Sequence, residues 1–210
     1  MTTQATQTYN NPIPVAVSII PVETEVSYQI DDFDITLNLL KVVYVRRNIQ
    51  PKLGMLALPG GFVNELERIE TAGARELLEE TGLIIEENDF QLFRSEITPN
   101  NRNLIFGITP TRSAGIIDTL NQNFKKSSDI QAETQEFVIA GLNIPDPAFP
   151  LHQKAIAKYL DKVNGEIILT YLKHFSDEKI NNVITQLKLE GYLSEEFAYL
   201  FNQKRKPFIS

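Results

Sequence analysis

The chain has 210 residues, enough for one domain of ordinary size with an appendage. Its 42% hydrophobic and 22% charged residues are typical of a globular protein and exclude an extensively disordered chain. The absence of cysteine excludes disulfides and thiolate metal sites, and the net charge of −7 argues against nucleic acid as a partner.

The N-terminal third of the chain contains two predicted strands. Residues 1–12 are polar and uncharged, so we expect a flexible tail there rather than a signal peptide. Branched apolar residues predict one strand over Val15–Val22 and another over Ile35–Val45, with a turn around Asp31–Asp34. No apolar run approaches the roughly 18 to 20 residues of a membrane span, so we expect no membrane partner. The absence of cysteine fits a cytoplasmic protein, which is the location we expect.

A helix is predicted next, after a break in the chain. The short apolar run Met55–Leu58 ends at Pro59-Gly60-Gly61, which predicts a tight break. The pattern then becomes helical over Ile69–Thr81, and Gly82 supplies a left-handed C-terminal stop. The residues expected to form the packing face of this helix recur at spacings of three and four: Ala74, Leu77, Leu78 and Thr81.

More strands and a second helix complete the predicted domain. Phe90–Ile97 and Asn103–Ile108 are expected to pair around a polar loop, and Phe137–Ile139 to form a further short strand. Leu151–Val163 has the pattern of an amphipathic helix. This order of elements predicts a mixed α/β (α+β) domain over residues 13–163.

Residues 164–210 are expected to form a helical C-terminal extension. Ser176 or Asp177 is a candidate cap for one helix, and Ser194 for another. The apolar stripes of these helices consist of Ile180, Val183, Ile184 and Leu187, and of Phe197, Leu200 and Phe201. Because such stripes need a partner surface, we expect the extension to pack on the domain or across a homodimer.

Three carboxylates in the predicted helix at 69–81 lie close together, although like charges on one helix face repel each other. Glu76, Glu79 and Glu80 share one helix face, where like charges cost roughly 0.2 to 0.5 kcal/mol per pair. Arg75 precedes Glu79 by four residues but cannot neutralise the whole set. A hard divalent cation held by oxygen ligands would complete such a site. On spacing alone, a solvated acidic helix face remains the more ordinary interpretation.

The surrounding segment changes that interpretation. Residues 61–83, GFVNELERIETAGARELLEETGL, resemble the Nudix box. Every constrained position of the box is filled at the correct spacing, by Gly61, Glu67, Arg75, Glu76, Leu77, Glu79, Glu80, Gly82 and Leu83. The resemblance implies an α/β/α sandwich with a mixed sheet and a catalytic loop–helix–loop. It also implies Mg²⁺-dependent hydrolysis of a diphosphate bond, with Mn²⁺ as a substitute metal.

The resemblance implies a role for each residue of the site. Glu79 and Glu80 match the principal carboxylate ligands of the metal, and Glu76 matches a further ligand or a base. The backbone carbonyl of Gly60 matches another ligand position. Glu67 and Arg75 match residues that support the loop and the ligands, and we include Glu76, Glu79 and Arg75 among the candidate catalytic residues.

Candidates outside the box are weaker. Many members of the family use a distal acidic residue as base or ligand, and Glu136 or Glu133 would suit this role, with Glu96 as a third option. Arg46 and Arg47 are candidate substrate-binding residues because they can contact phosphate, although surface or scaffold roles are more common for such arginines.

Two aromatic and two histidine residues are further candidates. Phe93 and Phe106 could form a base-stacking pocket, with core packing as the more ordinary role. His152 and His174 are isolated, and we expect surface or hydrogen-bonded positions for them rather than metal binding.

The substrate is less defined than the chemistry. ADP-ribose pyrophosphatases of this family often carry a proline at a set distance beyond the box, and Pro99, sixteen residues after Leu83, resembles it. A nucleoside-diphosphate derivative, ADP-ribose or a related nucleotide sugar, is therefore favoured. The alternatives are a nucleoside triphosphate pyrophosphohydrolase and a nucleotide-sensing transcriptional regulator, because residues 176–196 loosely resemble part of a winged helix.

Overall fold

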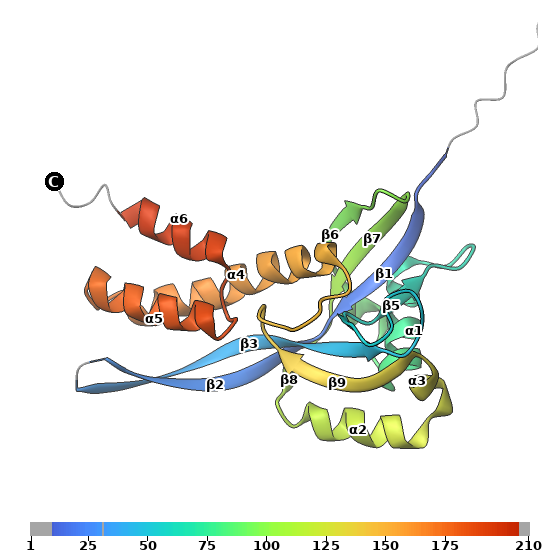
Figure 1. The fold of residues 1–210 in the computed structure, drawn as a ribbon, viewed down its shortest axis with the longest axis horizontal. Coiled ribbons are helices and arrows are strands. Elements are labelled where there is room, and N and C mark those ends of the chain that lie inside the picture. The colour runs from blue at the N-terminus through green and yellow to red at the C-terminus, as the bar shows by residue number, and fades with distance from the viewer. Residues whose placement is uncertain (1–9, 31, 206–210) are drawn as a thin grey trace, which may run out of the picture.

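The computed structural model describes residues 10–30 and 32–205. Over these residues the protein is a mixed α/β structure with two mixed sheets and six α-helices (Figure 1). The expected mixed α/β class is confirmed, although the strands form two sheets rather than one. None of the helices in these ranges combines the length and the apolar character needed to cross a bilayer.

The first sheet carries the predicted site segment on its edge. Its strands are, in order across the sheet, β5 (Gly60–Phe62), β1 (Ile13–Ile19), β7 (Arg102–Ile108) and β6 (Gln91–Ile97). β1 runs parallel to β7 and antiparallel to β5, and β6 runs antiparallel to β7. β5 is therefore an edge strand of this sheet.

The second sheet is built on a long hairpin, seen at the left of Figure 1. Its strands are β2 (Pro21–Ile30), β3 (Phe33–Arg47), β4 (Leu56–Ala57), β8 (Arg112–Ser113) and β9 (Thr134–Ala140). β2 pairs antiparallel with β3 over its whole length, from Ile30–Phe33 to Pro21–Val42, and β9 pairs with the C-terminal part of β3.

Helices cover both faces of the first sheet. On one face lies α1 (Ile69–Thr81), where Ala72 packs with Ala16 of β1 and with Phe90. On the opposite face lies α4 (Pro150–Leu172), whose Ile156 and Leu160 pack with Val17 and Phe106. This arrangement gives the helix–sheet–helix layers that the sequence resemblance implied. Two short helices, α2 (Ile116–Lys126) and α3 (Ser128–Glu133), pack against the second sheet.

Some of the strand predictions need correction. The expected strand Val15–Val22 is divided between two sheets, because β1 ends at Ile19 and β2 begins at Pro21. The expected break at Pro59-Gly60-Gly61 is wrong after Pro59, because Gly60 and Gly61 already pair with β1 as part of β5. The turn expected around Asp31–Asp34 falls between β2 and β3, with Asp31 itself and the tail 1–9 outside the described residues.

Among the helices, α1 has the predicted bounds but a different packing face. The buried residues of α1 are Ala72, Gly73, Leu77, Glu80 and Thr81, whereas Leu78 is 47% exposed. The predicted helix at Leu151–Val163 continues to Leu172, so α4 crosses residue 163 without a break. Within α4, residue 165 must be small, because a Cβ on Gly165 would stand 2.5 Å from the ring of Phe197.

The C-terminal extension packs on the hairpin, as expected. Its last two helices are α5 (Asp177–Leu189) and α6 (Glu195–Arg205). Ile180, Val183, Ile184 and Leu187 are all buried, in one cluster with Tyr28, Ile30, Leu37 and Leu39 of the hairpin and with the C-terminal half of α4. The Ser194 hydroxyl accepts the Phe197 N–H at 3.1 Å and so begins α6, as the sequence predicted.

Candidate active site

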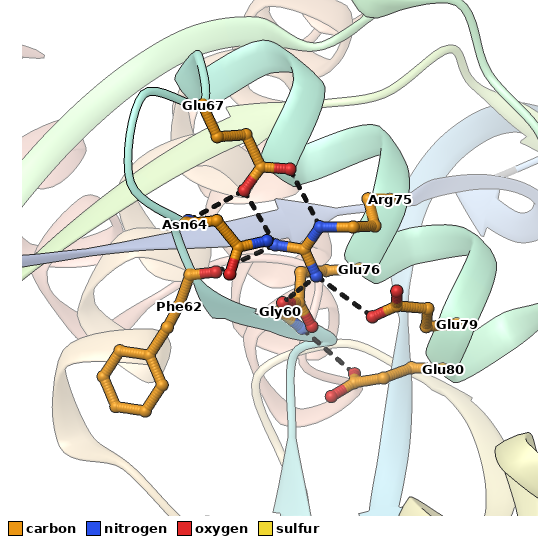
Figure 2. Close-up of polar contacts among 8 residues, drawn as sticks. All are labelled: Gly60, Phe62, Asn64, Glu67, Arg75, Glu76, Glu79 and Glu80. Atoms are coloured by element: carbon orange, nitrogen blue, oxygen red, sulfur yellow. Dashed lines mark hydrogen bonds and ion pairs between the residues drawn. The ribbon is translucent and has the colours of Figure 1, made fainter.

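The candidate carboxylates lie at the C-terminal end of α1, beside the edge strand β5. α1 ends at Gly82, whose φ of 70° is left-handed and whose N–H bonds the Leu78 carbonyl, so the predicted stop is confirmed. Two residues earlier, Glu80 is only 6% exposed, and its Oε2 accepts the Gly60 N–H at 3.0 Å (Figure 2). Burial, together with the charges of Glu133 and Glu76, raises the pKa of Glu80 to about 8 against the opposing Gly60 hydrogen bond.

Arg75 is the centre of the polar network. Its Nη1 donates to Glu76 Oε1 at 2.6 Å and to Glu79 Oε2 at 3.0 Å (Figure 2). Its Nε donates to Glu67 Oε1 at 2.8 Å, and its Nη2 donates to Glu67 Oε2 and to the Phe62 carbonyl. The guanidinium therefore ties the loop before α1 to the carboxylates on α1.

The pKa values of two carboxyl groups bound to Arg75 are shifted in opposite directions. Hydrogen bonds from Arg75 lower the pKa of Glu67 to about 2, and the Asn64 N–H, at 2.8 Å, contributes in the same direction. Burial raises the pKa of Glu76, against the opposing effect of Arg75. The supporting role that the sequence resemblance implied for Glu67 and Arg75 agrees with these contacts.

Two glycines allow close packing around β5, Gly60 against the backbone of β1 and Gly61 against Glu76. Gly60 has φ of +150°, and a Cβ there would stand 2.2 Å from the Ala16 carbonyl oxygen. A Cβ on Gly61 would stand 2.4 Å from a carboxylate oxygen of Glu76. A side chain at Gly60 would push β5 away from β1, and one at Gly61 would displace Glu76.

Oxygen donors of this kind fit a hard divalent cation such as Mg²⁺. Glu76 and Glu79 each place an oxygen within 3.0 Å of one Arg75 nitrogen, so a cation near that position would contact both carboxylates. Within the described ranges, no set of three His, Cys, Asp or Glu side chains is arranged to hold a metal ion. Arg75 stands between two of the candidate ligands instead.

The structure separates the two distal acids considered in the sequence. Glu136 forms an ion pair with Arg46, on the adjacent strand β3, at 2.7 Å from Nε, and its side chain is 53% exposed. Glu133, at the end of α3, raises the pKa of both Glu76 and Glu80 through its charge. Of the two, Glu133 is thus the one whose field reaches the carboxylates of α1.

The two candidate substrate-binding arginines also differ in whether their charge influences the carboxylates of α1. Arg46 donates from Nη1 to the Gly54 carbonyl at 2.8 Å in addition to its pair with Glu136. Arg47 lies over the Phe149 ring, 5.5 Å from its centroid, and donates to the Pro51 carbonyl at 3.0 Å. The positive charge of Arg47 also opposes the rise in the Glu80 pKa, so its field reaches the site.

Phe93, Phe106 and His152 belong to the core, whereas His174 is exposed, as expected for a surface residue. Phe106 is fully buried and meets His152 edge-on, and Phe93 meets Tyr159 edge-on. His152 is 7% exposed, and its Nδ1 accepts the Leu58 N–H at 3.2 Å, so it is a hydrogen-bonded core residue. Burial lowers the pKa of His152 to about 3.

Comparisons with known proteins agree with this geometry. The family model described as NUDIX domain matches residues 33–124. The ADP-ribose pyrophosphatase of Methanocaldococcus jannaschii is 34% identical over 125 residues, which are 60% of this chain and 69% of that protein. A MutT/nudix family protein from Enterococcus faecalis has a similar structure, with a TM-score of 0.54 and 17% identity over 97% of this chain and 84% of that one.

A MutT/nudix family protein from Listeria innocua gives a TM-score of 0.52 with 18% identity, over 77% of this chain and 99% of that one. These two structural likenesses concern the fold, whereas the family model and the archaeal relative concern the sequence itself. The family model and the 34% identical relative, together with the complete box on α1 and its loop, establish that the chain belongs to the Nudix hydrolase family.

Proposed function

We propose that this Nudix hydrolase cleaves the diphosphate bond of a nucleoside-diphosphate derivative in a Mg²⁺-dependent reaction, with ADP-ribose or a related nucleotide sugar as substrate. The observation that carries the proposal is the grouping of Glu76 and Glu79 around one point, with the buried Glu80 held beside them by Gly60. The name of the 34% identical archaeal relative supports ADP-ribose as the first substrate to test.

Each residue has a defined part in this proposal. Glu76, Glu79, Glu80 and the Gly60 carbonyl would hold the cation, which when bound neutralises the diphosphate and activates the attacking water. Arg75 and Glu67 fix the loop against α1, so the carboxylates stay in position. Glu76, Glu136 and Glu133 are the candidates to accept the proton of the attacking water.

The reaction balances as a hydrolysis. The water oxygen bonds to one phosphorus, the bridging P–O bond breaks, and the released oxygen leaves on the other phosphate. ADP-ribose would therefore yield AMP and ribose 5-phosphate. A nucleoside triphosphate substrate would instead yield a nucleoside monophosphate and inorganic diphosphate, and the products distinguish the two substrate classes.

Catalysis is favoured over DNA binding by the charge of the extension. The N-terminal turn of α6 presents Glu195 and Glu196, whose side chains are 83% and 62% exposed. Carboxylates at the N-terminal end of α6, the last helix of the extension, would repel DNA phosphates.

The first test measures turnover of ADP-ribose with Mg²⁺ and identifies both products by chromatography. Glu79→Gln and Glu80→Gln should each lower turnover by about two orders of magnitude or more, because a neutral amide poorly replaces a carboxylate facing Mg²⁺. In the Glu80→Gln variant the side-chain amide oxygen can still accept the Gly60 N–H, so the fold should be retained. Glu86→Gln, an exposed carboxyl group beyond α1, is the matched control.

Near-normal turnover in both variants would contradict the proposed site. Chelation of the metal should abolish turnover while the thermal melting temperature stays that of a folded protein. Cleavage of nucleoside triphosphates without cleavage of ADP-ribose would replace the substrate but keep the site.

A further inference from the structure

One face of the first sheet carries an exposed aromatic ring next to the candidate site. Phe62 of β5 lies in register with Val15 of β1, and Val15 with Leu104 of β7, so these three side chains share the face that α4 covers. α4 buries the part of this face around Val17 and Phe106. Towards the other end of the strands the face is open, and Phe62 is 54% exposed.

Alternation along β5 places this ring across the strand from the carboxylates. Gly61 faces α1, since a Cβ there would meet Glu76. The next residue, Phe62, must therefore point to the opposite face of the sheet. β5 is the edge strand of the sheet, and the two residues before Phe62 are glycines, which carry no side chain beyond the backbone.

The backbone of Phe62 is bonded to the site, and its ring contacts a guanidinium on the same face of the sheet. The carbonyl of Phe62 and the carboxylate of Glu79 are both bound to the guanidinium of Arg75, at 2.9 and 3.0 Å (Figure 2). The guanidinium of Arg102, in the neighbouring part of the same face, lies 4.9 Å from the centroid of the Phe62 ring. An aromatic ring that keeps about half its surface in water is suited to stacking on a planar ligand.

We propose that Phe62 stacks against the nucleobase of the substrate and so selects base-bearing diphosphates. The inference rests on the proposed function, because the diphosphate must lie at the carboxylates of α1 for its nucleoside to reach across the edge of β5. Purines should stack better than pyrimidines, because their ring surface is larger. The aromatic residues that the sequence suggested for this role, Phe93 and Phe106, are engaged with Tyr159 and His152 in the core.

The test compares Phe62→Leu with Phe62→Trp, because leucine removes the ring at similar size and tryptophan restores an aromatic surface. For ADP-ribose, Phe62→Leu should raise KM between about 5- and 100-fold with little change in kcat, and Phe62→Trp should recover most of the loss. For a diphosphate that joins two riboses and has no base, KM should be the same in all three proteins. Leu66→Ala is the matched control, since Leu66 is fully exposed in the same loop and has no ring.

A second measurement does not depend on hydrolysis. AMP and ribose 5-phosphate are titrated into the wild-type and Phe62→Leu proteins by calorimetry, after equal melting temperatures confirm that both are folded. We expect AMP to bind more weakly to the variant, and ribose 5-phosphate to bind equally to both. Equal AMP affinity in the two proteins, or an equal rise in KM for substrates with and without a base, would overturn the inference. Phe62-dependent AMP binding in a protein that cleaves no diphosphate would preserve the base site and refute the proposed function alone.

Discussion

Asn164 offers a direct test of how the extension is attached to the rest of the protein. This asparagine lies in the middle of α4 and is fully buried. Its Oδ1 accepts the Leu40 N–H at 2.8 Å, and its Nδ2 donates to the Leu40 carbonyl at 3.0 Å and to the Tyr192 carbonyl at 2.9 Å. One carboxamide thus joins β3 of the hairpin to the turn between α5 and α6.

Replacing Asn164 with alanine leaves three backbone groups without these partners: the buried Tyr192 carbonyl and the half-buried N–H and carbonyl of Leu40. An orphaned buried group costs about 1 to 3 kcal/mol, and a carbonyl often keeps a second contact, so the expected loss in the free energy of unfolding is about 2 to 5 kcal/mol. For a protein of this size, 1 kcal/mol corresponds to about 2 to 4 °C in Tm. The variant should therefore melt about 4 to 20 °C below the wild type.

Thermal melting followed by circular dichroism and by calorimetry measures this loss. Asn182→Ala, at an exposed position on α5, is the control and should change Tm by less than about 1 °C. The wild type should show one transition, because α4 contributes to the core clusters on both sides of residue 163. An unchanged Tm for Asn164→Ala, or two separate transitions in the wild type, would refute the reasoning.

Three further predictions concern stability. His152 has its pKa lowered to about 3 from an ordinary value of about 6.5, so the stability it contributes is complete above pH 6.5 and falls as the pH drops towards 3. Relative to His152→Gln, the wild type should lose up to about 2 kcal/mol between pH 6.5 and 5 in urea unfolding, and a pH-independent difference would contradict this. Gly82→Ala should cost about 1 to 2 kcal/mol by the same assay, because Gly82 has φ of 70° and a Cβ would stand 2.7 Å from Asn123 Nδ2; an unaltered unfolding midpoint would exclude strain at this position. Removal of residues 174–210 should cause aggregation visible by light scattering, because it exposes the apolar side chains of the hairpin, Tyr28, Ile30, Leu37 and Leu39. A monodisperse truncated protein with the original Tm would show that the extension is dispensable.

The catalytic segment was predictable from the sequence because its signals are local. The bounds of α1, its glycine stop and the grouping of its carboxylates follow from spacing within a few residues of one another. The packing face was only partly predictable, because Gly73 is buried for a tertiary reason. The ring of Phe90 fills the space between Gly73 and Gly107 of β7, a residue distant in the chain.

Other features of the fold depend on contacts between distant parts of the chain, which a local sequence pattern does not reveal. β2 was missed beyond Val22 because Glu23, Glu25, Ser27 and Gln29 are polar, and the strand exists through its pairing with β3. The burial of His152 required knowledge that α4 packs beside Leu58. Likewise, the exposure of Phe62 follows from its place on an edge strand, which is a property of the sheet order.

The position of α4 explains how one helix can serve both the core and the extension without carrying the site. Near its N-terminus, His152 holds the Leu58 N–H, two residues before the glycine that binds Glu80. Three turns later, Asn164 holds β3 and the turn before α6. The carboxylates themselves lie on α1, against the opposite face of the first sheet. Changes in the extension should therefore affect stability first, and should affect turnover only where they disturb the backbone from Leu58 to Gly60.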